Sequence, residues 1–424
     1  MKQKSLKNTV RNIVLVVLTL LLAVLTLLNV VFALGWEPLF HAFWQSLGQA
    51  ALGYEVRSGD SPAAYPSSAA MTGADGRLYG AAYHERTVAQ VYEATRELMG
   101  SALGTASGFT PLTEDGLRTM LAGETLCYAY NGEIPAAALA AWMESRSTLD
   151  EDISMLLLTR DGQLALRTKS QGLVLATAAV DRNAWARASA ALGAGTCSYA
   201  GTSGGTAFRN LAPETLLFEE TGFSAEILAC EPPAFGDPNA ADSLQTLLGG
   251  FGYSVYARSY EERDAQVYVD NDSTMRISAD GTVRFTSARR EAEGEPLALA
   301  AAIEQARLIL EQAQYSIGAG TQAELLSAAE DGSGGQTLLF GLVFEGIPVV
   351  TGEPYARFEF QDGQLVTAVV RLRRYTASGK RQYVLPAAQA AAASPRKGQR
   401  LGIAYVEGED GSFAPERCFT FVEE

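Results

Sequence analysis

The chain has 424 residues, which is more than one hydrophobic core usually organises, so two or three domains are expected. Its net charge is −15, and the first twelve residues hold four cations and no acid, so the rest of the chain is more acidic still. A body of this charge is repelled by phosphate backbones, which argues against nucleic acid as a partner.

An uncharged segment of 22 residues runs from Ile13 to Leu34. A helix of this length spans about 33 Å, which is enough to cross the hydrocarbon core of a membrane. Cations precede the segment, and Trp36 follows it. The positive-inside rule therefore predicts a cytoplasmic tail over residues 1–12, a transmembrane helix over 13–35 and an extracytoplasmic body.

A cleaved signal peptide is the alternative interpretation, because Val31 and Ala33 fit a small-residue cleavage pattern. The apolar run is, however, longer than the roughly 7 to 15 residues of a signal peptide's core. A retained anchor is therefore favoured.

Small and hydroxylic residues recur along one face of the predicted transmembrane helix, and such residues let a second helix approach closely. The predicted partner-binding face consists of Thr19, Ala23, Thr26, Asn29 and Ala33. The alternative is that these residues are scattered by chance and that the helix only anchors the protein.

The segment from Gly53 to Thr72 is rich in Ser, Ala, Gly and Pro and shows little periodicity, so a mobile connection is predicted within a linker over 36–72. Beyond it, an Asp-Gly pair stands four times between strand-like segments, which predicts four hairpins. These pairs are Asp75-Gly76, Asp161-Gly162, Asp280-Gly281 and Asp362-Gly363.

Helical periodicity separates or follows these hairpins, so the expected fold class is α+β, with antiparallel sheets that carry helices on one face. The predicted helices cover Arg86–Met99, Pro135–Glu144, Asp181–Ala191, Leu297–Gln312 and Pro386–Ala393. Exterior domains are expected over 73–230, 231–315 and 316–424. The last two look like variants of one design, a curled sheet paired with an Ala-rich helix.

The stretch "QVYVDNDSTMRISADGTVRF", residues 266–285, resembles a calcium loop at its first acids. Counted from Asp270, however, the glycine position holds Met275 and the bidentate glutamate position holds Gly281, so the loop lacks both its bend and its main ligand. Alternating apolar residues instead predict three short strands with turns at 271–272 and 280–281.

Few residues suggest catalysis. "GTSGG", residues 201–205, matches a nucleophile elbow around Ser203, but the only histidines, His41 and His84, precede it, so a glycine-rich loop is favoured. "SPRK", residues 394–397, matches a Ser-x-x-Lys motif, but Pro395 breaks the turn that the motif needs. His84 itself is interpreted as a solvated side chain.

Metal and cofactor sites are not expected either. Glu261, Glu262 and Asp264 are interpreted as a solvated acidic loop rather than a weak divalent-ion site. The four cysteines stand singly, which gives no zinc or redox pattern and leaves one disulfide or four thiols open. No cofactor is expected, and an enzyme is the less favoured interpretation. The cysteines are Cys127, Cys197, Cys230 and Cys418.

These patterns together resemble the YycH family and its relative YycI. The resemblance rests on the single inside-to-outside helix, on "VYVDNDSTMRISADGTVRF" followed by a helix, and on "FGLVFEGIPVV" before a second meander. "LCYAYNGEIPAAALAAWM" and "FGDPNAADSLQTLLGGFGYSVYARSYEERDAQVYVDNDSTMRIS" are also similar to that family. A Pro-x-Trp associated with the family's end is here Pro415-Glu416-Arg417.

The resemblance implies a membrane-anchored, non-enzymatic regulator of the WalK (YycG) sensor histidine kinase of a two-component system in Gram-positive bacteria. It implies contacts to the kinase within the membrane and outside it, with a YycI-like paralogue as a further partner. Two other functions stay open from the residues themselves. One is a cell-surface binding module for an envelope ligand or lipid, and the other is a secreted hydrolase centred on Ser203.

Overall fold

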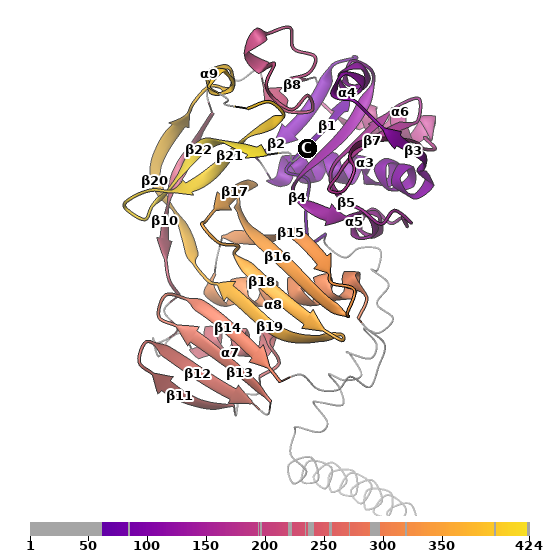
Figure 1. The fold of residues 1–424 in the computed structure, drawn as a ribbon. Helices are drawn as coiled ribbons and strands as arrows, with labels where there is room; N and C mark the ends of the chain where they lie inside the picture. The colour runs from indigo at the N-terminus through magenta and orange to yellow at the C-terminus, as the bar shows by residue number, and fades with distance from the viewer. Residues whose placement is uncertain are drawn as a thin grey trace, which may run out of the picture. The chain divides into compact units, whose positions relative to one another are not determined.

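A computed structural model describes most of the chain after residue 61, and every described residue belongs to one compact unit, Val56–Glu424. Seven α-helices and a set of mostly antiparallel strands make it an α+β fold, as expected (Figure 1). The described residues are 62–83, 85–193, 195, 197–218, 223–233, 235, 241–253, 257–270, 272–288, 297–318, 320–393 and 396–421. Within these ranges no helix is long and apolar enough to span a membrane, and the predicted transmembrane helix lies outside them.

The first sheet is antiparallel throughout, in the order β2-β1-β4-β5-β6-β7-β3. Its strands are β1 (Ser68–Thr72), β2 (Leu78–Ala82), β3 (Ser107–Pro111), β4 (Thr125–Pro135), β5 (Asp152–Thr159), β6 (Gln163–Thr168) and β7 (Gly172–Thr177). The helices of this region are α3 (Glu85–Thr105), α4 (Glu114–Leu121), α5 (Ala136–Trp142) and α6 (Arg182–Ala191).

Both faces of this sheet are covered, whereas the sequence led us to expect helices on one face. Leu117 of α4 packs with Leu157 on one face, and Tyr92 of α3 packs with Tyr128 on the other, with ring centroids 5.6 Å apart. The apolar run of β5, residues 155–158, agrees with this arrangement because a strand buried on both faces has no polar alternation.

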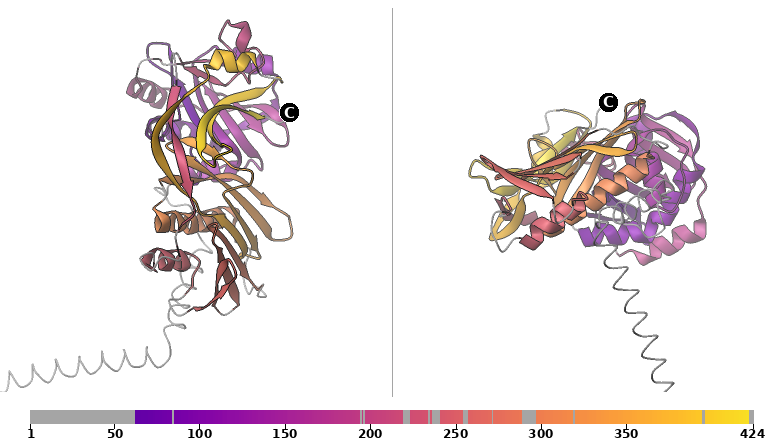
Figure 2. Two further views of the ribbon diagram at one scale, coloured as in Figure 1. Left: turned by 90° about the vertical axis from the view of Figure 1, so that its left-hand side faces the viewer. Right: turned by 90° about the horizontal axis from the view of Figure 1, so that it is seen from below.

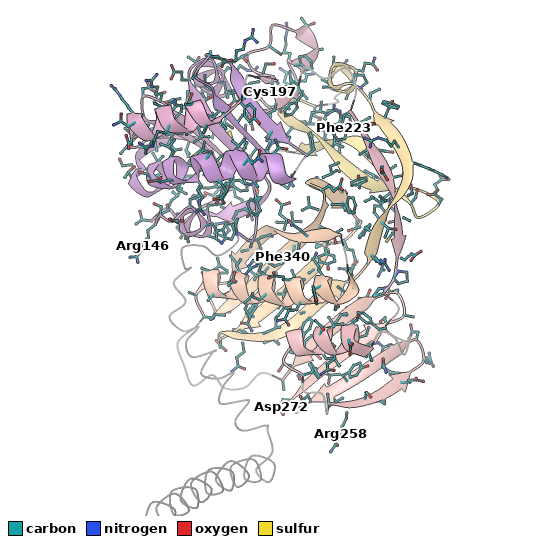
Figure 3. All side chains as sticks on the ribbon, turned by 180° about the vertical axis from the view of Figure 1, so that it is seen from behind. Arg146, Cys197, Phe223, Arg258, Asp272 and Phe340 are labelled. Carbon is teal, nitrogen blue, oxygen red and sulfur yellow. The ribbon has the colours of Figure 1, made fainter. Side chains whose placement is uncertain are left out.

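A second set of strands follows the order β11-β12-β13-β14-β19-β18-β16-β15. They are β11 (Arg258–Glu262), β12 (Ala265–Asp270), β13 (Ser273–Ser278), β14 (Thr282–Ser287), β15 (Thr321–Glu330), β16 (Gly335–Phe344), β18 (Ala356–Gln361) and β19 (Gln364–Arg371). Helices α7 (Ala241–Gly250) and α8 (Leu299–Ile317) lie on the same side of these strands (Figure 2). Phe340 of β16 is fully buried (Figure 3).

The third region pairs distant parts of the chain. Strand β10 (Phe223–Glu231) pairs along its length with β20 (Arg374–Val384), and β21 (Gln399–Glu407) pairs with β22 (Phe413–Phe421). Strand β17 (Ile347–Val350) joins this region to β16 on one side and to β21 on the other. The remaining elements are β8 (Cys197–Tyr199), η2 (Thr206–Phe208), β9 (Leu216–Phe218) and α9 (Ala387–Ala392).

Strands β4 and β15 connect the first sheet to the second by a parallel bridge between Glu133 and Ser327. The backbones approach closely here, because a Cβ at Gly132 would lie 2.1 Å from the carbonyl oxygen of Leu326. The Leu325 amide also donates to the Ala63 carbonyl at 2.8 Å. Glycine is therefore required at position 132.

The four predicted Asp-Gly hairpins are confirmed, as turns between β1 and β2, β5 and β6, β13 and β14, and β18 and β19. The five predicted helices are confirmed as α3, α5, α6, α8 and α9, although α3 and α8 extend beyond their predicted ends.

Two further expectations were wrong. Residues 68–72 are not a mobile connection, because they form β1 between β2 and β4. The domain boundaries expected near residues 230 and 315 stay predictions; strand β10 pairs with β20 across the first, and β14 pairs with β19 across the second. The two Ala-rich helices are also not equivalent, because α8 packs on β15 and β16 whereas α9 packs in a cluster with Leu211 and Leu401.

Candidate functional site

The predicted partner-binding face, Thr19, Ala23, Thr26, Asn29 and Ala33, lies outside the described residues, and so does His84. Ser203 lies in the turn after β8, where its hydroxyl donates to the carbonyl oxygen of Ala200 at 3.2 Å. That contact is local and does not involve a general base. It gives no support to a hydrolase centred on Ser203.

The sequence suggested that the acids before the meander form a loop, but the structure shows that they do not. Glu261 and Glu262 belong to β11, and Asp264 lies in the turn to β12. Arg276 of β13 pairs with Glu262 and, at 3.3 Å, with Asp264. In the described part of the chain no group of three His, Cys, Asp or Glu side chains is placed to hold a metal ion.

The stretch from 266 to 285 forms the strands β12, β13 and β14, which confirms the meander. The described structure contains no disulfide between the four cysteines, which favours the alternative of four thiols. Burial raises the pKa of Cys127, Cys230 and Cys418, which disfavours their reactive thiolate forms.

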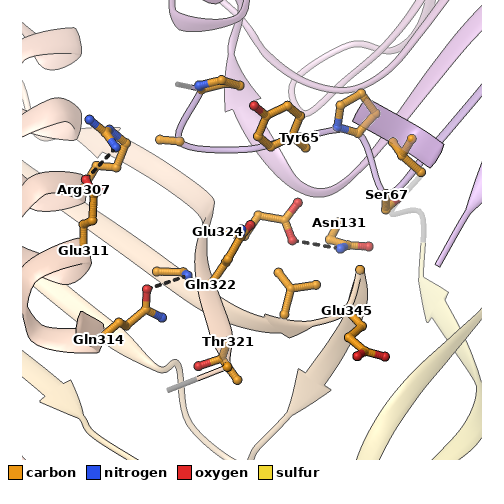
Figure 4. A pocket seen from close by; sticks show the side chains of 18 residues that line it. Tyr65, Ser67, Asn131, Arg307, Glu311, Gln314, Thr321, Gln322, Glu324 and Glu345 are labelled. Carbon is orange, nitrogen blue, oxygen red and sulfur yellow. Dashed lines mark hydrogen bonds and ion pairs between the residues drawn. The ribbon is translucent and has the colours of Figure 1, made fainter. Parts of the chain in front are cut away.

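A cavity of about 550 Å³ lies where the chain before β1 and strand β4 meet α8 and β15 (Figure 4). Tyr65 and Asn131 line it from the first sheet's side. From the other side it is lined by side chains of α8, of β15 and of the turn between β16 and β17. The polar residues that matter most there are Gln314, Thr321, Glu324 and Glu345.

Glu324 is the most unusual side chain of the cavity, because its carboxyl group is only 9% exposed and has no cationic partner in the part of the chain that the structure describes. The Asn131 side-chain amide donates to its Oε2 at 3.0 Å. Burial raises the pKa of Glu324 to about 7, and the hydrogen bond from Asn131 only partly offsets this effect.

Two further polar side chains line the cavity, but Gln314 Nε2 and Thr321 Oγ1 are themselves enclosed by the protein. The Gln314 side chain is a hydrogen-bond partner of Tyr355, which partly offsets the rise that burial causes in the pKa of Tyr355. Gln314 is 8% exposed and Thr321 is 6% exposed. The amide of Gln314 has a defined orientation, because its Oε1 accepts a hydrogen bond from the Ala323 backbone at 3.3 Å.

The charges that line the cavity are mostly negative. Among the described residues, Glu311, Glu324 and Glu345 line it together with one cation, Arg307. The guanidinium of Arg307 is already paired with Glu304 at 2.6 Å and with Glu311 at 3.2 Å. The cavity therefore suits a ligand that is neutral or positively charged.

A second cavity, of about 250 Å³, lies beside Cys230 and Tyr375. Its two guanidinium groups, on Arg371 and Arg373, make contacts within the protein. Arg371 pairs with Glu353 and donates to Pro354, and Arg373 lies 3.6 Å from Asp280. The larger cavity is consequently the better candidate site.

Comparison of the chain with protein-family models, with curated proteins and with solved structures finds no match in any of the three. The candidate site therefore rests on its geometry alone. Sequence reasoning missed all of its residues, which come from separate segments. The one usable signal was Glu324 itself, an acid within the otherwise largely apolar strand "AELLSAA".

Proposed function

We propose that this chain is a single-pass, YycH-like membrane protein that regulates a WalK-type sensor histidine kinase without catalysing a reaction. The observation that carries the proposal is the uncharged segment Ile13–Leu34, which four cations precede and a large body follows. The β12–β14 meander and the hairpin of β16 and β17 support it, because they occupy the segments on which the resemblance rests.

Regulation of this kind needs only differential binding. A regulator that contacts one signalling state of the kinase better than the other shifts the equilibrium by that difference in affinity. In the membrane, helix association depends on close packing and on hydrogen bonds worth roughly 0.6 kcal/mol on average. The small residues of the predicted face supply both.

Replacement of Ala23 and Thr26 by Leu is expected to reduce co-purification of the kinase severalfold, because it adds bulk where the helices meet. The matched control replaces Leu21 and Val24 by Ile, which changes mainly the opposite side. Pull-down from detergent-solubilised membranes measures both. Equal behaviour of the two variants, with insertion and expression intact, would show that recognition does not use this face.

The topology is tested separately. A protease added to intact protoplasts is expected to digest the body after Trp36. The reason is that cations, which favour the cytoplasmic side of a membrane, precede the predicted span and do not directly follow it. A cytoplasmic protein serves as the control for lysis. A body that survives while added extracellular protein is degraded would contradict the orientation.

A second candidate function, an extracytoplasmic binding module for an envelope ligand or lipid, is favoured by one observation. The carboxyl group of Glu324, a side chain that is only 9% exposed, lines a cavity large enough for a small molecule, since such sites commonly measure about 300–1,000 Å³. This function is compatible with the first, because a ligand can control a regulator.

A further inference from the structure

We propose that this protein pairs with a second copy of itself through the exposed edge of strand β11, in an antiparallel register centred on Tyr260. The pairing would join the second sheets of the two copies into one sheet with a twofold axis. The inference goes beyond the proposed regulation of a kinase and does not depend on it.

The outer edge of β11 is open to another strand. Strand β11 ends its sheet, and among the described residues it pairs with β12 alone (Figure 1). All five of its residues, Arg258–Glu262, are exposed, and Arg258 lies at this edge (Figure 3). The other end of the sheet, β15, is instead joined to β4. The outer backbone N–H and C=O groups of an edge strand can pair with a strand of a second chain.

This edge lacks most of the features that protect edge strands from pairing, which include proline, bulges and lysine. Strand β3, an edge of the first sheet, has two of them, because it ends in Pro111 and its register with β7 is shifted. Strand β11 contains no proline, glycine or lysine, and its register with β12 is continuous. Its charged side chains are its only protection, so their order decides whether a second copy fits.

The charges of β11 are complementary to those of a second copy. In the sequence Arg-Ser-Tyr-Glu-Glu, antiparallel pairing centred on Tyr260 places Arg258 opposite Glu262 of the second copy. Twofold symmetry makes this contact twice. Opposite charges directly across a ladder stabilise it, and like charges destabilise it. Glu262 already pairs with Arg276 of its own chain, so its carboxylate would lie between two guanidinium groups.

The register is specific. Opposite residues of an antiparallel pair must both turn their backbone groups toward the other strand or both turn them away, so the twofold axis passes through a residue. An axis at Ser259 or Glu261 would shorten the ladder to three residues of β11. An axis at Glu261 would also place that carboxylate opposite its own copy. Only the axis at Tyr260 uses the whole strand and forms both Arg–Glu pairs.

Tyr260 adds an apolar contact at the centre of the pairing. It is 55% exposed, although its neighbour across the ladder, Val267, is buried. In the dimer the two Tyr260 rings would face one another across the new ladder, and aromatic pairs of this kind stabilise sheets. A ladder of five residues is a small interface, so the dimer should be weak and should depend on protein concentration.

Reversal of the charges tests the pairing. Arg258→Glu brings a second carboxylate opposite Glu262, and Glu262→Arg brings a second guanidinium opposite Arg258. Each variant alone should therefore dimerise more weakly than the wild type, by about tenfold or more. An equal mixture of the two should dimerise as well as the wild type, because each chain supplies the charge that the other needs. Sedimentation velocity of the full-length protein in detergent, over a series of concentrations, measures the dimer. Glu97→Arg, a reversal at an exposed position of α3, should have no effect.

A disulfide tests the register. Opposite residues of an antiparallel pair have Cα atoms about 4.5–5.5 Å apart, which a disulfide can bridge. Tyr260→Cys should form a linked dimer on mild oxidation, because its two copies meet on the axis. The two copies of Arg258→Cys would lie four positions apart along the ladder, roughly 13 Å, and should not be linked. The wild type, with its four cysteines, gives the background.

Three results would overturn the inference. A wild type that stays monomeric would show that the charged side chains of β11 protect this edge. Dimerisation that both charge variants leave unchanged would show that the copies meet elsewhere, for example through the predicted membrane helix. Equal linkage of Tyr260→Cys and Arg258→Cys would contradict the register. None of these results bears on co-purification of the kinase.

Discussion

Glu324 shows how one residue couples burial to pH. In the unfolded chain its carboxyl group titrates near 4.5, whereas in the folded protein burial raises the pKa to about 7. The folded state therefore holds the proton more tightly, and the stability gained from the protonated form is lost as the pH rises from about 4.5 to 7.

Glu324→Gln is expected to remove this loss. The variant should match the wild-type free energy of unfolding near pH 4.5 and exceed it at pH 8 by up to roughly 3 kcal/mol, because a shift of one pKa unit corresponds to about 1.4 kcal/mol. Urea unfolding at the two pH values measures this difference. A stability change that is the same at both would contradict the raised pKa.

At the scale of elements, Gly281 is constrained by both its conformation and its surroundings. It lies in the turn between β13 and β14 with φ of +81°, and a Cβ there would lie 2.3 Å from the Leu372 carbonyl oxygen. The Leu372 amide also donates to the Gly281 carbonyl at 3.0 Å. The turn is therefore packed against the end of β19.

Gly281→Ala should destabilise the protein more than Gly411→Ala, its matched control. Gly411 has φ of +76° and nothing within 4 Å of its Cβ position, so its substitution costs only the left-handed conformation, about 1–2 kcal/mol. At Gly281 the steric overlap adds roughly 1–3 kcal/mol. Chemical denaturation measures the loss in free energy of unfolding for both variants. Equal losses would mean that the Leu372 carbonyl moves away from the new Cβ at little cost.

Local elements were predictable from the sequence because their signals are local. An Asp-Gly turn determines its own hairpin, and Asp181 before α6 is an N-cap whose side chain accepts from the Asn183 amide. Helix α4 was missed although its signal was present, since Thr113 caps it and Leu117 and Leu121 follow at helical spacing.

The long-range pairings and the cavity were not predictable in this way. Strand β10 has no turn that leads to β20, because the two are separated by more than a hundred residues. The cavity is formed by side chains that meet only after the first two sheets have joined. The apolar pattern around Glu324 indicated a strand but did not show that Asn131 would lie beside the acid.

At the scale of the whole molecule, three charged side chains connect segments that are distant in the sequence. Arg167 of β6 makes a bidentate contact with Glu214, with distances of 3.0 to 3.2 Å, and Arg400 of β21 lies 3.9 Å from the same carboxylate. Arg400 also donates to the Tyr130 carbonyl of β4 at 2.7 Å. Burial lowers the pKa of Arg400, and the nearby charge of Glu214 opposes this effect.

Glu214→Gln is expected to cost about 3–5 kcal/mol, because it removes the carboxylate that pairs with the largely buried guanidinium of Arg167. The control is Glu124→Gln, whose partner Arg160 is about half exposed, and an exposed pair contributes at most about 1 kcal/mol. Thermal or denaturant unfolding compares the two. If the two variants lose similar, small amounts of stability, water or another group must compensate the charges of Arg167 and Arg400.

The pairing of β10 with β20 also has a consequence for how the protein reaches its native state. The partners Phe223 and Val384 are 161 positions apart in the sequence, so contact formation must wait for a long loop to close. The first sheet lies wholly within residues 68–177, so it can assemble before the chain that contains β20 is available. During vectorial delivery of the chain, β10 keeps an unpaired edge until β20 arrives, and this interval is when aggregation competes most strongly with folding.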